Sequence, residues 1–168
     1  MNELKIPHTI PEEVSNLFNP AFCGVLIHQI VVGYKKESGN DIPYFLLFII
    51  FPILMHKPTR DLLPKTLATK LHPWIQDHQE VKIGFEKRVK TMNKYVRNAI
   101  VFGLQQQILV LKENGEIKAN ELKLKNIDKE SSEASACIVK ALMVGRWFGI
   151  AGDLSTVVAL WNIKTLKN

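Results

Sequence analysis

The residues of this sequence that could bind a metal ion or act as acid, base or nucleophile are five histidines and two cysteines. The histidines stand at positions 8, 28, 56, 72 and 78 and form no HExxH motif and no pairing with a carboxylate at helical ligand spacing. Cys23 and Cys137 lie in apolar stretches far apart, which predicts buried, reduced thiols. No glycine-rich phosphate loop is present. We therefore expect no catalytic residue, metal ligand or cofactor, and predict that the protein is not an enzyme.

A second group with chemical potential is the stretch ILMHKPTRDLLPK, which turns from apolar to cationic at His56. His56, Lys57 and Arg60, gathered at one corner, could bind a carboxylate or a phosphate. Pro58, however, restricts the residue before it to extended backbone and favours a new helical turn, so the stretch would form a corner without any function. The residues alone leave both interpretations open.

Positive charge is concentrated in one quarter of the chain. The net charge is +6, and residues 57–97 hold ten Lys or Arg against four Asp or Glu, whereas the remainder holds twelve of each sign. The whole excess therefore lies in this quarter. Such an asymmetry is typical of a face that meets an anion, either nucleic acid or an acidic protein surface.

The clearest part of this basic region is a predicted helix from residue 81 to about 104. One side carries the apolar residues Phe85, Val89, Met92, Val96 and Ile100 at a spacing near 3.6. The other side carries Lys87, Lys90, Lys94 and Arg97 over a length of about 15 Å. We predict that these four contact DNA or an acidic partner. The alternative is an ordinary solvated helix face, and few aromatic residues accompany the cations, which gives little support to base stacking.

The elements around these residues are mostly helical. Asn19 and Pro20 predict a helix start, and Gly39 predicts its end. We expect Asp41 to open the next, very apolar helix and Pro52 to kink or end it. Three prolines limit residues 58–78 to short helical turns.

A hairpin and two further helices are predicted in the last third. Apolar β-formers on both sides of Asn114-Gly115, followed by the alternating residues 121–125, predict a hairpin. A helix over 133–148 should follow, and Asp153 should cap the last helix. Gly145, Gly149 and Gly152 are small residues that favour close helix packing.

Length and composition predict one compact domain over residues 1–168. With 46% hydrophobic residues, the chain can form a core. The predicted parts are a helical region (about 10–106), a hairpin (about 107–125) and C-terminal helices (about 130–165). The fold class is mostly α with a small β-hairpin (α+β). A winged-helix-like module suits this order, as do other α+β arrangements.

The longest apolar stretch is 14 residues, which is short for a membrane span. The N-terminus has no signal pattern, so we expect a cytoplasmic protein without membrane contact.

Four segments together resemble a known family: NPAFCGVLIHQIVVGY, PYFLLFIIFPILMHKPTRDLLP, ILVLKENGEIKANELKL and STVVALWNIKT. They are similar to the middle component of three-component ABC-ATPase conflict systems, a group that includes the small subunit of Lamassu-type antiviral defence complexes. The most specific feature is an apolar run that ends in His-Lys-Pro-Thr-Arg and is preceded by an Asn-Pro helix start.

The resemblance implies a non-enzymatic adaptor. Its partners would be an SMC/Rad50-like ABC ATPase and an effector, often a nuclease, and DNA would be met through the complex. Such an adaptor would help couple detection of foreign DNA to release of the effector. The resemblance also makes His56, Lys57 and Arg60 candidates for a fixed internal network or a partner contact. A free-standing winged-helix DNA-binding regulator is the competing hypothesis, and a small enzyme with an unrecognised site is the third.

Overall fold

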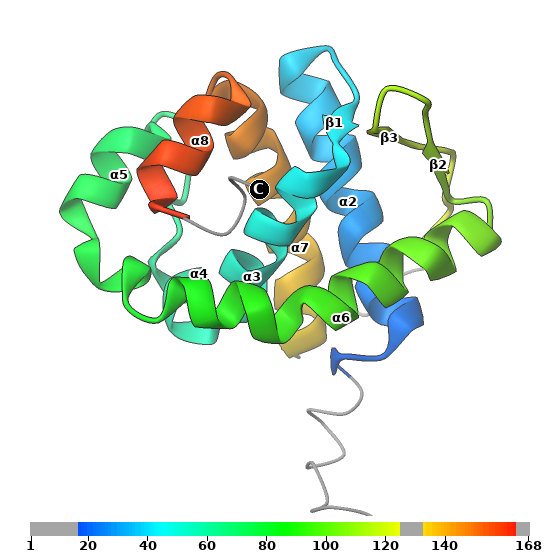
Figure 1. Ribbon diagram of the computed structural model, residues 1–168, viewed down its shortest axis with the longest axis horizontal. Helices are drawn as coiled ribbons and strands as arrows, with labels where there is room; N and C mark the ends of the chain where they lie inside the picture. Colours follow the sequence, from blue (N-terminus) through cyan, green and yellow to red (C-terminus); the bar gives the residue numbers. More distant parts are fainter. Residues whose placement is uncertain (1–16, 125–132, 164–168) are drawn as a thin grey trace, which may run out of the picture.

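The computed structural model describes residues 17–124 and 133–163 (Figure 1). Its elements are α2 (Pro20–Ser38), β1 (Ile42–Pro43), η1 (Tyr44–Leu46), α3 (Leu47–Met55), α4 (Lys57–Leu62), α5 (Leu71–Asp77), η2 (Gln79–Lys82), α6 (Phe85–Gln105), β2 (Leu109–Leu111), β3 (Glu116–Ala119), α7 (Glu133–Ile150) and α8 (Leu154–Trp161). Helices dominate, and the strands form one small antiparallel sheet. The predicted α+β class is confirmed.

Helices α2 and α7 form the centre of the molecule and run side by side (Figure 1). Glycines set their close approach. An ideal Cβ placed on Gly33 would lie 2.2 Å from the carbonyl oxygen of Leu142, and one placed on Gly145 would lie 2.2 Å from that of Ile30. The predicted role in packing is thus confirmed for Gly145. Gly152 differs, since it has a φ of 98° and no neighbour within 4 Å of an added Cβ.

The helix caps predicted at Asn19, Gly39 and Asp153 are present in the structure. The Asn19 side chain accepts a hydrogen bond from Ala21 N at 2.8 Å, Gly39 ends α2 with a φ of 75°, and Asp153 accepts from Thr156 N at 2.9 Å. The prediction for Asp41 was wrong. Asp41 does not cap a helix, because it is followed by β1 and its carboxylate binds two lysines instead.

Helix α3 crosses the core and is buried along nearly all its length. It continues through Pro52 to Met55, so Pro52 does not end it. The buried apolar side chains of the helices and strands form a single hydrophobic cluster. Among residues 17–124 and 133–163, no single helix is long and apolar enough to cross a membrane, and only α7 and α8 taken together, bent at their junction, reach that length and composition.

Helix α6 lies across one side of the bundle (Figure 1). It begins at Phe85, later than predicted, because Gly84 has a φ of 68° and separates it from η2. Its inner side is the predicted one: Phe85, Val89, Val96 and Ile100 are buried, and Met92 packs partly against the core.

The sheet has the strand order β1-β3-β2. The predicted turn at Asn114-Gly115 joins β2 to β3, with Leu109 opposite Ala119. Two features differ from the prediction. Strand β1 pairs with β3 through Ile42 and Ile117, and residues 121–124 form no strand. Residue 125, the predicted end of the hairpin, lies outside the described residues. The residue after β3, Asn120, also contacts α2: its carbonyl oxygen lies 2.7 Å from Nε2 of the buried His28.

Candidate functional site

The exposed side of α6 carries the four predicted cations. Lys87, Lys90, Lys94 and Arg97 are all exposed, and they lie on the side of α6 opposite the buried Val89 and Val96 at helical spacing. We call this surface the cationic face. Because the buried residues fix the rotation of the helix, the four positive charges must point away from the core.

Two members of the cationic face have local partners. Lys90 Nζ lies 3.1 Å from Glu86 Oε1, and Lys94 Nζ lies 4.9 Å from the centre of the Tyr95 ring. For Lys87 and Arg97, the described part of the chain provides no ion-pair partner. An exposed lysine-glutamate pair on a helix contributes little free energy and exchanges readily. The face therefore keeps a net positive charge that is available to an incoming anion.

Arg88 has a structural role and does not extend this face. Its guanidinium donates to the carbonyl oxygens of Ile83 and Val81, each at 2.7 Å, and lies 5.6 Å from the centre of the Phe85 ring. Burial lowers the pKa of Arg88 from its usual value. These bonds hold the turn that precedes α6, so Arg88 fixes where the cationic face begins.

Arg60 is the centre of the corner between α3 and α4. It is 4% exposed, donates to the carbonyl oxygen of Leu54 at 2.8 Å, and forms an ion pair of 2.5 Å with Glu133 at the start of α7. A buried guanidinium needs such partners because an unpaired buried charge is costly. Arg60 therefore joins the end of α3 to the start of α7.

The other two predicted corner residues differ from each other. His56 Nδ1 lies 2.8 Å from Oγ1 of the buried Thr59, and burial, followed by the charges of Arg88 and Arg60, lowers the pKa of His56. The lowered pKa favours the neutral form of the His56 imidazole. Lys57 is exposed and pairs with Asp61, which is also exposed, at 2.6 Å. The structure thus gives His56 and Arg60 separate hydrogen-bond partners within the fold and leaves Lys57 on the surface.

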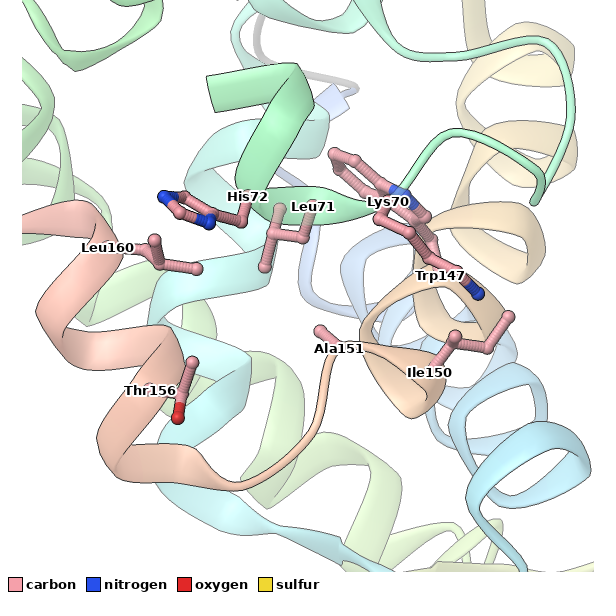
Figure 2. A pocket seen from close by; sticks show the side chains of 8 residues that line it. All are labelled: Lys70, Leu71, His72, Trp147, Ile150, Ala151, Thr156 and Leu160. Carbon is pink, nitrogen blue, oxygen red and sulfur yellow. The ribbon is translucent and has the colours of Figure 1, made fainter. Parts of the chain in front are cut away.

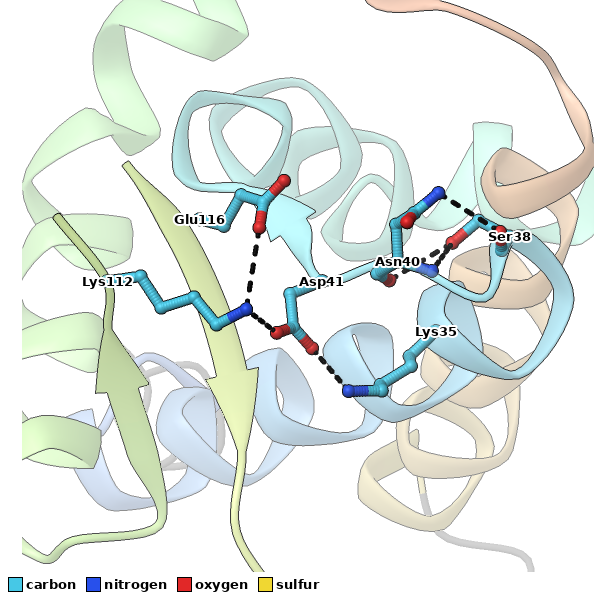
Figure 3. A network of polar contacts seen from close by, with 6 residues as sticks. All are labelled: Lys35, Ser38, Asn40, Asp41, Lys112 and Glu116. Atoms are coloured by element: carbon cyan, nitrogen blue, oxygen red, sulfur yellow. Dashed lines mark hydrogen bonds and ion pairs between the residues drawn. The ribbon is translucent and has the colours of Figure 1, made fainter. Parts of the chain in front are cut away.

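A buried carboxylate that the sequence pattern did not reveal links three elements (Figure 3). The Asp41 side chain is 3% exposed and lies 2.8 Å from Lys35 Nζ of α2, and it also pairs with Lys112 just after β2. Burial by itself raises the pKa of Asp41, but the hydrogen bonds from Lys112 and Lys35 outweigh that effect and hold it below its usual value. No local signal could have shown this pairing, because Asp41 and Lys112 are far apart in the sequence.

The described residues include a pocket and two buried thiols. A pocket of about 220 Å³ lies between α5, α7 and α8, and Figure 2 shows its largely apolar lining, with Lys70, His72 and Thr156 as the polar members. No hydrogen bond joins these three side chains to one another among the described residues. In the described ranges, no three His, Cys, Asp or Glu side chains gather as metal ligands would. Cys23 and Cys137 are buried free thiols, and burial raises the pKa of Cys23 to about 12, which disfavours the reactive thiolate.

Comparison with models of protein families gives a match. The sequence model of the family described as ABC-three component (ABC-3C) system Middle Component 3 matches residues 8–165. Comparisons with curated proteins and with solved structures give no significant match.

Proposed function

Because the chain belongs to the family of Middle Component 3 of ABC-three component systems, we propose that it is a non-catalytic adaptor subunit that docks on the ABC ATPase of such a system. The cationic face is the observation that carries this proposal. Four cations lie on one exposed helix side, whereas the buried charged residues Asp41 and Arg60 each have ion-pair partners within the chain. A protein built in this way presents a charged contact surface on a rigid core.

The adaptor would help couple recognition of DNA by the complex to activation of an effector, with a nuclease as the leading candidate. The ATPase would be SMC/Rad50-like and would supply the nucleotide chemistry. The complex would act in the cytoplasm as an antiviral defence system of the Lamassu type. The family membership supports the three-component organisation, and the charge of α6 supports contact with an anionic partner, either DNA in the complex or an acidic protein surface.

Co-expression of the three components tests the adaptor role. We expect the chain to co-purify with the ATPase in a complex that survives size-exclusion chromatography. A stable homodimer that binds DNA by itself and does not bind the ATPase would contradict the proposal.

Replacing Lys87, Lys90, Lys94 and Arg97 by Glu should weaken contact of the complex with its anionic partner. Unchanged assembly together with unchanged DNA affinity and salt dependence would remove any role for the cationic face.

The second candidate is a free-standing DNA-binding regulator with a winged-helix-like module. The observation that favours it is the hairpin β2-β3 directly after the cationic helix, completed by β1 as the third strand. This candidate predicts duplex binding by the isolated chain that weakens steeply as salt rises. Filter binding or fluorescence anisotropy at two salt concentrations would separate it from the adaptor.

A further inference from the structure

Strand β2 leaves one of its edges unpaired in the described sheet. Lys112 N donates to Glu116 O at 2.8 Å, and Asn120 N donates to Ile108 O at 3.0 Å. In an antiparallel pair, hydrogen-bonded and non-bonded positions alternate. The backbone N–H and C=O groups of Leu109 and Leu111 therefore point away from β3. Leu109 is 2% exposed, so its groups are covered within the fold, whereas Leu111 is exposed and presents its N–H and C=O at the free edge. Such an edge is a template for one more strand.

The free edge is bordered by exposed apolar side chains. Val110 is 40% exposed and Leu111 is 51% exposed. An open hollow of about 450 Å³ lies beside them, lined by Leu104, Gln107, Leu109, Val110, Leu111 and Asn120. Apolar residues next to unpaired backbone groups are the combination by which proteins accept an extended peptide.

The lysine nearest to this strand does not protect its edge. Edge strands commonly carry a lysine that discourages further pairing. The Lys112 side chain instead reaches back across β3, where it pairs with Asp41 and lies 3.6 Å from Glu116 (Figure 3). Its charge is therefore held on the side of the hairpin that faces β1, and Lys112 does not cover the β2 edge at Leu111.

The cationic face continues into this apolar region. Val101 is 50% exposed and lies one helical turn after Arg97 on the same side of α6, and Leu104 in the next turn lines the hollow. Figure 1 shows the C-terminal end of α6 beside the start of β2. One surface thus runs from the positive charges of α6, through Val101, to the free edge of β2.

The composition of this surface favours a protein segment over DNA. Phosphates would match the cations, but a duplex offers nothing to an apolar strand edge with free backbone donors and acceptors. An extended polypeptide with apolar residues and neighbouring carboxylates matches both parts. On the basis of the proposed adaptor function, we propose that β2 and the C-terminal half of α6 bind such a segment of another component. Its apolar residues would pair along β2, and its acidic residues would lie against Arg97 and Lys94.

Site-specific photo-cross-linking in the assembled complex tests this docking. The photoreactive amino acid p-benzoyl-phenylalanine would be placed at position 101, 111 or, as a control, 139, since Val139 is an apolar residue on α7 that is 70% exposed. All components would be co-expressed with duplex DNA present, and cross-linked peptides would be identified by mass spectrometry. We expect positions 101 and 111 to label the same short segment of another component, with Asp or Glu near the labelled apolar residues, and position 139 not to label it.

The outcomes separate this inference from the adaptor proposal. Labelling of DNA, labelling of a second copy of this chain, or yields no higher than at position 139 would overturn the docking inference while leaving the adaptor role intact. Failure of the chain to co-purify with the ATPase would overturn both.

Backbone pairing itself is tested by two variants at one position. Leu111→Ala and Leu111→Pro both remove the leucine side chain, but only proline removes the N–H that points to the free edge. We expect Leu111→Pro to weaken assembly about threefold to tenfold relative to Leu111→Ala, with far-ultraviolet circular dichroism unchanged. Equal affinities of the two variants would rule out strand addition.

Discussion

At the scale of single residues, two buried charges connect parts of the chain that are distant in sequence. Asp41 joins α2 and β1 to the hairpin, and Arg60 joins α3 to α7. In both cases the buried group is the one whose removal matters most, because its charged partners are exposed and can regain water. Mutating Asp41 or Arg60 therefore measures how much the contacts of that residue contribute to the free energy of unfolding.

Asp41→Asn should lower the free energy of unfolding by about 1–3 kcal/mol at pH 7, since hydrogen bonds to a charged group are lost. The folded pKa of Asp41 lies below its unfolded value of about 3.9. The contribution is thus complete above that value and disappears as pH falls through the folded pKa. Urea denaturation of wild type and variant between pH 7 and pH 3 should show their difference shrinking below about pH 4.

A difference between wild type and Asp41→Asn that stays constant across this pH range would contradict the ionic origin. Asp61→Asn is the matched control, because Asp61 also pairs with a lysine but is exposed. It should change the stability little.

Arg60→Ala should destabilise the fold by about 3 kcal/mol, because a buried, paired guanidinium is removed and Leu54 O loses its donor. Arg60→Lys keeps the charge, but its single ammonium nitrogen cannot occupy the positions of both guanidinium nitrogens that bind Leu54 O and Glu133, so an intermediate loss is expected. Chemical denaturation gives both values. Lys57→Ala, at the exposed position of the same corner, serves as the control.

The Arg60 variants also decide whether the corner has a role beyond stability. If Arg60→Ala keeps both its fold and its assembly with the ATPase, the stretch from His56 to Arg60 is only a corner between helices.

At the scale of elements, the molecule depends on the close contact of α2 and α7. Gly145→Ala would place a methyl group 2.2 Å from the carbonyl oxygen of Ile30, which the backbone of α2 cannot avoid. Alanine is a better helix former than glycine by about 1 kcal/mol. The expected net loss of about 3 kcal/mol must therefore come from the separation of the helices.

Thermal and urea unfolding of Gly145→Ala test this prediction. Val139→Ala lies on the same helix but is exposed, and should have little effect. A Gly145→Ala variant as stable as the wild type would show that the contact is looser than the structure indicates.

At the scale of the whole molecule, the distribution of charge is the property on which the proposed function depends most directly. Reversing Lys87, Lys90, Lys94 and Arg97 to Glu should weaken assembly with the partner about tenfold or more, since like charges would then meet. Wild-type assembly should also weaken as salt rises, and the variant should lose most of that dependence. Surface plasmon resonance at several salt concentrations measures both effects.

A control with the same change in net charge reverses four other exposed lysines: Lys36, Lys65, Lys70 and Lys123. If this control weakens assembly as much as the first variant, net charge rather than the cationic face is responsible.

The sequence by itself determined what depends on neighbours within one or two turns. The caps at Asn19 and Gly39, the turn at Asn114-Gly115 and the exposed stripe of α6 follow from side-chain spacing and backbone preference, and the structure confirms each of them. Only the tertiary structure decided that Arg60 pairs with Glu133, that Asp41 meets Lys112, and that β1 completes the sheet and leaves β2 at its edge. These contacts join segments tens of residues apart. They leave no periodic or local signal, because they exist only once the packing of α2, α3 and α7 brings those segments together.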